Sequence, residues 1–269
     1  MKTAHYFSVL FFLFFAIPSF ACTSVIVSSK HTKDGKAVMF KHRDSECQDV
    51  NVEYFQGEKY RLVGLVNTEW RTKPSAKIPL GTPEVWGGMN ETGFAIMNTA
   101  TYDLKDDDVP QEMMDCEGVF MYRALEICET LEDFEHFLDT LSRPMRVEAN
   151  FGVINEKGGA AYYEVNNHKW VKYDVNKEPL GYRVVTNFTM TGREDKRLGV
   201  ERYIKTHKIL ASTYVPMENW DHTFFITNIS CTGKPIMRES SSCAMVFEGR
   251  TFWATKGKPD RTPIVGYTL

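Results

Sequence analysis

The sequence predicts an α+β fold in which helices are layered on mainly antiparallel sheets within one domain. Short runs rich in β-branched and aromatic residues are separated by turn sequences containing Gly, Asn or Asp, a pattern typical of antiparallel strands. Stretches in which apolar residues recur with helical spacing interrupt these runs. No repeat, low-complexity block or linker divides the 269 residues. The elements are therefore expected to share one domain.

The composition is that of a folded globular protein, with 43% hydrophobic and 25% charged residues. The 32 Lys and Arg residues nearly balance the 35 Asp and Glu residues, leaving a formal net charge of -3. This balance argues against a nucleic-acid-binding protein that relies on phosphate neutralisation. No CxxC pair, HExxH motif or spaced His/Cys cluster is present, so neither a metal site nor a cofactor is expected.

The N-terminus has the pattern of a secretory signal peptide. A basic residue precedes an apolar stretch too short to span a bilayer, and Ser19 and Ala21 are the small residues that a signal peptidase reads. Residues 1–21 are therefore expected to be removed. The mature chain, 22–269, should be exported, with no integral membrane segment, and should begin with Cys22.

The first strands are expected as two hairpins. One joins Thr23–Ser29 to Ala37–His42 through a polar segment, and the other joins Val85–Met89 to Phe94–Asn98 through a turn sequence. Both belong to the half of the chain that precedes the predicted helices.

Two helices are expected next. Glu117–Glu129 has helical spacing, and Thr130 with Asp133 forms a capping box for the second helix. The second helix carries apolar residues at i, i+3, i+4 and i+7, namely Phe134, Phe137, Leu138 and Leu141. Pro144 then stops it, because proline cannot continue a helix.

The rest of the chain is expected to form strands around a third helix. Strands are predicted at Phe151–Ile154, Ala160–Val165, Trp170–Val175 and Arg183–Phe188. The helix should cover Glu194–Leu210, with Val200, Ile204 and His207 on one face. Closing strands are expected at Phe224–Ile226, Ala244–Phe247 and Thr251–Ala254.

The expected chemistry centres on Cys22. Cleavage after residue 21 would give this residue a free α-amine, whose reference pKa of about 8 lets it accept a proton from the adjacent thiol near neutral pH. One residue would then supply both nucleophile and base. None of the histidines belongs to a recognisable Cys/His protease motif.

These residues resemble a known family. Cys22–Val27 and Lys41–Asp44 are similar to the opening of the N-terminal nucleophile (Ntn) hydrolases of the choloylglycine hydrolase and penicillin acylase type, a group related to acid ceramidases and isopenicillin N acyltransferases. Further segments resemble the family in the same order: Gly88–Ala95, Asn150–Glu164, Val185–Phe188 and the helix that carries Arg197 and Arg202. The resemblance covers most of the mature chain.

The resemblance implies a four-layer αββα sandwich and the hydrolysis of a linear amide C–N bond. Cys22 would attack the carbonyl carbon and form an acyl-enzyme. Asp44 would orient the α-ammonium or the thiol, with a strand-end ion pair as its structural alternative. Asn187 would donate its side-chain amide to the tetrahedral oxyanion, with a strand-end turn as its alternative.

Four further positions are candidates through the same resemblance. Lys41 stands where the bile-salt members carry an Arg, and Arg43 is the nearest Arg. Because Lys lacks the bidentate fork of Arg, the polar contact to the thiol should differ. Asn98 lies near the family's second oxyanion Asn, and Arg238 precedes the last strands where an active-site Arg is common. A strand-end Asn and a solvated surface Arg are the alternatives for these two residues.

Other functions remain open at this stage. Cys22 could instead be a lipid-attachment site that anchors a surface binding domain, although the residues before it suit ordinary cleavage better. An acyltransferase would use the same nucleophile. The expected partner is a small-molecule amide, and bile salts, penicillin V, N-acyl amino acids, short peptides and N-acylethanolamines all stay open, as does a homo-oligomer.

Overall fold

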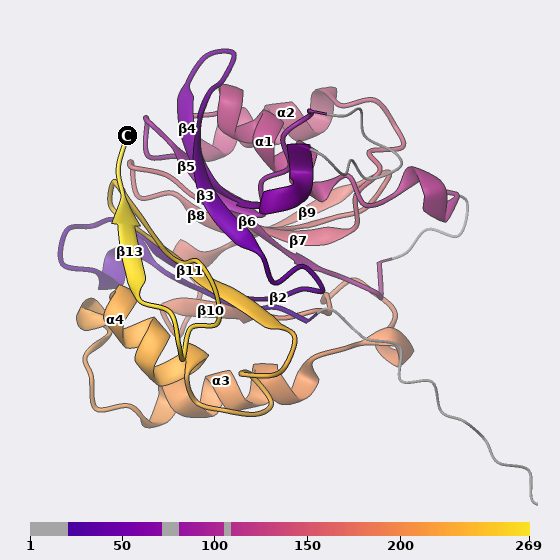
Figure 1. The fold of residues 1–269 in the computed structure, drawn as a ribbon. Coiled ribbons are helices and arrows are strands. Elements are labelled where there is room, and N and C mark those ends of the chain that lie inside the picture. The colour runs from indigo at the N-terminus through magenta and orange to yellow at the C-terminus, as the bar shows by residue number, and fades with distance from the viewer. Residues whose placement is uncertain (1–20, 72–80, 105–108) are drawn as a thin grey trace, which may run out of the picture.

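The elements form four layers in the computed structural model, which describes residues 21–71, 81–104 and 109–269. Figure 1 shows helices α1 and α2 on one side, then a 7-stranded sheet, a 6-stranded sheet, and helices α3 and α4 on the other side. Three clusters of buried hydrophobic residues fill the spaces between successive layers. The predicted α+β class and αββα layering are therefore confirmed.

The 6-stranded sheet has the order β10-β1-β2-β11-β12-β13, and all its neighbouring strands are antiparallel. Its strands are β1 (Thr23–Val27), β2 (Val38–Asp44), β10 (Tyr182–Val185), β11 (Ser241–Glu248), β12 (Thr251–Thr255) and β13 (Ile264–Tyr267). Both faces of this sheet are covered, one by the second sheet and one by helices.

The 7-stranded sheet follows chain order and is also antiparallel throughout. Its strands are β3 (Val50–Gln56), β4 (Arg61–Asn67), β5 (Gly87–Asn90), β6 (Ala95–Ala100), β7 (Ala149–Ile154), β8 (Ala160–Val165) and β9 (Trp170–Asp174). β3 and β4 were not among the predicted strands, and neither was β13.

The helices are α1 (Glu117–Ile127), α2 (Leu131–Thr140), α3 (Val200–Ser212) and α4 (His222–Phe225). The predicted capping box is present, because the Thr130 side chain accepts a hydrogen bond from the Asp133 backbone N–H and the Asp133 carboxylate accepts one in return. No helix in the described part of the chain is long and apolar enough to cross a membrane.

Two predictions about the C-terminal half were wrong. Phe224–Ile226 is not a strand, since α4 begins at His222, where the Asp221 carboxylate caps the Phe224 N–H. The third helix begins only at Val200, after a separate short turn over Glu194–Lys196.

The face that Val200, Ile204 and His207 share is not the buried face of the third helix. Val200 and Ile204 are 39% and 46% exposed, whereas Arg202, Thr206 and Leu210 form the buried row. The spacing of the apolar residues did not predict the buried face, because a charged residue, Arg202, is the first buried residue of this helix.

Strand alternation determines which side chains face the space between the sheets. Along β2, Met39 belongs to the cluster between the sheets, whereas Phe40 belongs to the cluster beneath α3 and α4. Because side chains alternate along a strand, Lys41 and Arg43 share the inter-sheet face with Met39. The same argument places Cys22 on the same face as Ile26. The side chains of Cys22, Lys41 and Arg43 therefore lie at one end of the apolar layer between the two sheets.

Candidate active site

A cavity of about 510 Å³ opens at this polar end. Its walls include five of the predicted site residues, namely Cys22, Lys41, Arg43, Asp44 and Asn98. Arg238 reaches the same region through Asp44, whereas Asn187 is not among the described residues that line the cavity. Cys22, the Lys41–Asp44 segment and Asn98 are well separated in the sequence, and the fold brings them together around one cavity.

Cys22 precedes β1 directly and is 7% exposed. Its sulfur is not part of a disulfide. The carbonyl oxygen of the preceding residue, Ala21, accepts a hydrogen bond from the Arg238 guanidinium at 3.1 Å, and the carbonyl oxygen of Cys22 accepts one from Arg202. The backbone on both sides of the thiol is thus held by an arginine.

Asp44 is a buried carboxylate with several donors. One oxygen accepts a hydrogen bond from the Ser241 hydroxyl at 2.7 Å, and the other is paired with Arg238. His42 lies 3.5 Å from the same carboxylate. Burial pushes the pKa of Asp44 up, but the hydrogen bonds and charges of His42 and Arg238 outweigh it and hold this pKa below its usual range. Asp44 is therefore a fixed negative charge.

Lys41 is a buried cation that faces the second sheet. Its Nζ donates hydrogen bonds to the Trp86 carbonyl oxygen at 2.7 Å and to Asn98 Oδ1 at 2.9 Å. Burial lowers the pKa of Lys41 to about 8, while the negative charge of a Cys22 thiolate acts in the opposite direction. The ammonium is therefore close enough to Cys22 to interact with it electrostatically.

Arg43 lies beyond Lys41 on the same face of β2. Its two terminal nitrogens donate to Ser242 Oγ at 3.1 Å and to Asn67 Oδ1 at 3.0 Å. The guanidinium carbon lies 5.3 Å from the centroid of the Trp86 ring. These contacts fix the guanidinium in one orientation on the cavity wall.

The two candidate oxyanion donors differ in their surroundings. Asn98 lines the cavity and accepts from Lys41 through Oδ1, and its Nδ2 makes no hydrogen bond to a described residue. Asn187 is fully buried, and its Nδ2 donates to the Ala100 carbonyl oxygen at 2.7 Å. Ala100 thus uses one of the two N–H donors of this amide, and Asn187 is not among the described residues that line the cavity.

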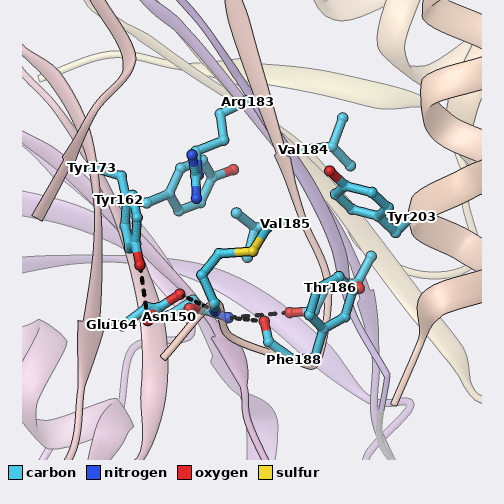
Figure 2. Close-up of a pocket in the computed structure, with 11 residues that line it drawn as sticks. Asn150, Tyr162, Glu164, Tyr173, Arg183, Val184, Val185, Thr186, Phe188 and Tyr203 are labelled. Atoms are coloured by element: carbon cyan, nitrogen blue, oxygen red, sulfur yellow. Dashed lines mark hydrogen bonds between the residues drawn. The ribbon is translucent and has the colours of Figure 1, made fainter. Parts of the chain in front are cut away.

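Asn150, which lines a second, small cavity, holds the segment around Asn187 by hydrogen bonds. Figure 2 shows Asn150 of β7 bridging to the backbone that flanks Asn187: its Nδ2 lies 3.3 Å from the Thr186 oxygen and 3.0 Å from the Phe188 oxygen. The cavity measures about 10 Å³, which is room for about one water molecule. This cluster is a structural clamp between the sheets.

Arg202 is a site residue whose importance the sequence reasoning missed. It is 1% exposed, and its guanidinium donates to the Cys22 carbonyl oxygen, to Thr23 Oγ1 at 3.2 Å and to Asn187 Oδ1 at 2.8 Å. Burial lowers the pKa of Arg202 from its ordinary value. The resemblance gave only its helix, and no local pattern indicates that a charged residue on an amphipathic helix points inward.

The cavity wall also contains acidic residues from and around α1. Asp115, Glu117 and Glu148 line it. Glu117 accepts a hydrogen bond from the Glu148 backbone N–H at 2.9 Å, and burial raises the pKa of Glu117 to about 7. None of these residues was predicted, since the segment carries no motif.

Comparisons with known proteins identify the fold. No family model and no curated protein matches the chain. Among solved structures, a Caenorhabditis elegans ortholog of N-acylethanolamine-hydrolyzing acid amidase is 15% identical, with a TM-score of 0.60 over 92% of this chain and 100% of that chain. Penicillin V acylase from Agrobacterium tumefaciens is 14% identical, with a TM-score of 0.57 over 92% of this chain and 86% of that chain.

A variant of the conjugated bile acid hydrolase from Clostridium perfringens is 13% identical, with a TM-score of 0.55 over 92% of this chain and 97% of that chain. The similarity therefore extends over nearly the whole described fold and over nearly all of two of the three solved chains. The protein has the Ntn-hydrolase fold that these three amide-cleaving enzymes share.

Proposed function

We propose that this protein is an exported cysteine hydrolase that cleaves a linear amide C–N bond through an acyl-enzyme on Cys22. The observation that carries the proposal is the position of Cys22, which lines the 510 Å³ cavity together with Lys41, Asp44 and Asn98. A nucleophile, a cation, an oriented carboxylate and an amide donor are the groups that acyl transfer requires.

The proposed reaction begins after removal of residues 1–21. The α-amine of Cys22 accepts the thiol proton, and the thiolate attacks the amide carbonyl carbon. When the tetrahedral intermediate collapses, the C–N bond breaks and the ammonium returns the proton to the leaving amine. Water then attacks the thioester, with the amine again accepting a proton, and releases the carboxylic acid.

Asn98 is the better-supported oxyanion donor. Lys41 holds Oδ1 of Asn98, which leaves Nδ2 available to donate to an oxygen in the cavity. A preorganised donor of this kind contributes about 3 kcal/mol to transition-state stabilisation. Asn187 contributes through its neighbours, because Arg202 connects its side chain to the backbone of Cys22.

Asp44 and Arg238 are proposed to orient the nucleophile. The Arg238 guanidinium pairs with Asp44, and in the uncleaved chain it also reaches the carbonyl oxygen of Ala21, which is bonded through its carbon to the Cys22 nitrogen. After cleavage the new α-ammonium would lie beside this fixed carboxylate, which matches its charge. The pair would thereby hold the terminal nitrogen next to its own thiol.

Trapping the acyl-enzyme tests the proposal. Mature protein is quenched in acid during turnover of a panel of amides and analysed by intact mass and peptide mapping. We expect a chain that begins at residue 22 and carries the acyl group of the substrate on Cys22. A diacylglycerol on Cys22 would instead identify a lipid anchor, which the near-complete burial of this residue disfavours.

The same experiment distinguishes a hydrolase from an acyltransferase. An acyltransferase passes the trapped acyl group to an added amine faster than to water. Release of free carboxylic acid at an unchanged rate in the presence of amines supports the hydrolase.

Lys41 is expected to set the alkaline limit of the reaction. Its pKa of about 8 means that the ammonium loses its charge, and with it the stabilisation of the Cys22 thiolate, as the pH rises through that value. We expect kcat/KM to fall about tenfold per pH unit above about pH 8. In Lys41→Arg, whose guanidinium does not titrate, this limb should disappear from pH–rate profiles. An unchanged alkaline limb in Lys41→Arg would exclude Lys41 as its origin.

A further inference from the structure

The cavity next to Cys22 contains a buried cation, Arg43, whose described hydrogen-bond partners are all uncharged. Arg43 is 4% exposed and lines the cavity, yet it forms no ion pair with a carboxylate of the described residues. Its hydrogen-bond acceptors are a hydroxyl and an amide oxygen, both uncharged. Buried charges are normally paired, because desolvation makes an isolated one costly.

Acidic residues line the same cavity, namely Asp44, Asp115, Glu117 and Glu148, but none of them forms an ion pair with Arg43. Asp44 follows Arg43 in sequence and is held by Arg238 and Ser241. Lys41 adds a second positive charge on the face of Arg43 and also lacks a carboxylate partner among the described residues.

The guanidinium is also prepared for a planar anion. Arg has five N–H donors, and described residues accept hydrogen bonds from two of them. Ser242 and Asn67 fix the plane of the group, and the Trp86 ring lies against it. A rigid guanidinium with unused donors on a cavity wall matches the bidentate geometry of a carboxylate.

We propose that Arg43 is a specificity-determining residue that binds a carboxylate of the substrate, so that the enzyme prefers N-acyl amino acids to neutral amides. This inference rests on the proposed function, because it assigns the substrate class of the same cavity. The anion enters as the missing counter-ion of Arg43, close to the nucleophile, while Lys41 remains the partner of the Cys22 thiolate.

Two probes that differ in a single group test the inference: N-octanoylglycine, which ends in a carboxylate, and N-octanoylethanolamine, which ends in a hydroxyl. We expect wild-type kcat/KM to be about tenfold to a hundredfold higher for N-octanoylglycine, the size of effect that a charge-assisted hydrogen-bonded pair produces. In Arg43→Met this ratio should fall by at least tenfold, and Arg43→Lys should retain part of it. The exposed Arg250→Met provides the matched control and should keep the wild-type ratio.

Binding measured without turnover separates this inference from the proposed function. Calorimetry with Cys22→Ala should show tighter binding of N-octanoylglycine than of N-octanoylethanolamine, and the added Arg43→Met substitution should remove the difference. Carboxylate-selective binding without turnover by the wild type would count against the proposed function alone. Turnover or binding that does not distinguish the two probes in the wild type overturns the role of Arg43, whether or not the variants fold.

Discussion

Replacing Cys22 with Ala is expected to lower kcat by at least about 10³-fold, because the acyl-enzyme can no longer form. Cys22→Ser keeps an oxygen nucleophile, but a hydroxyl is far harder to ionise than a thiol, so a loss of at least about 10²-fold is expected. Both variants should unfold at temperatures within a few degrees of the wild type, since the substitutions remove little buried volume. Steady-state turnover and thermal unfolding of the mature chain measure both effects.

Cys243 supplies the matched control for this experiment. It lies on β11, opposite Arg43 of β2, and is fully buried, so it is a second interior cysteine close to the same cations. Burial raises the pKa of its thiol, which keeps it protonated and unreactive. Cys243→Ala should retain turnover within a few-fold. Full activity in Cys22→Ala, or its loss in Cys243→Ala alone, would contradict the assignment of the nucleophile.

The sequence was informative where chemistry is local. Cys22 and Asp44, which line one cavity, could be singled out from the sequence because one follows the predicted cleavage site and a short motif carries the other. The capping box of α2 and most strand positions followed from turn residues and alternation. β3 was missed because it mixes polar and apolar residues without a strong apolar run. β4 is a buried apolar run interrupted only by Gly64, so its sequence did carry a strand signal.

Long-range pairing accounts for what could not be predicted. The uncharged partners of Arg43 are Asn67 of β4 and Ser242 of β11, and these strands come close to β2 only in the folded protein. The hydrogen bond from Asn187 to Ala100 likewise joins residues 87 positions apart. No periodicity in a single segment encodes such contacts, so side-chain roles that depend on them emerge only from the structure.

Arg202→Leu is expected to destabilise the fold by about 3–5 kcal/mol and to lower kcat strongly. Leu fills much of the volume but donates no hydrogen bond, so the Cys22 carbonyl oxygen, Thr23 Oγ1 and Asn187 Oδ1 lose their shared donor in the interior. These acceptors connect the nucleophile segment to the Asn187 segment. Loss of these hydrogen bonds should therefore lower both the free energy of unfolding and kcat. Urea unfolding measures the first and steady-state kinetics the second.

The intermediate and control variants show whether charge or geometry matters. Arg202→Lys keeps the positive charge but cannot reach all three acceptors with one point-like ammonium, so a loss of stability between those of wild type and Arg202→Leu is expected. Lys208→Ala, an exposed change on the same helix, should alter the free energy of unfolding by less than about 0.5 kcal/mol. Wild-type stability and turnover in Arg202→Leu would mean that β1 holds Cys22 in position without help from α3.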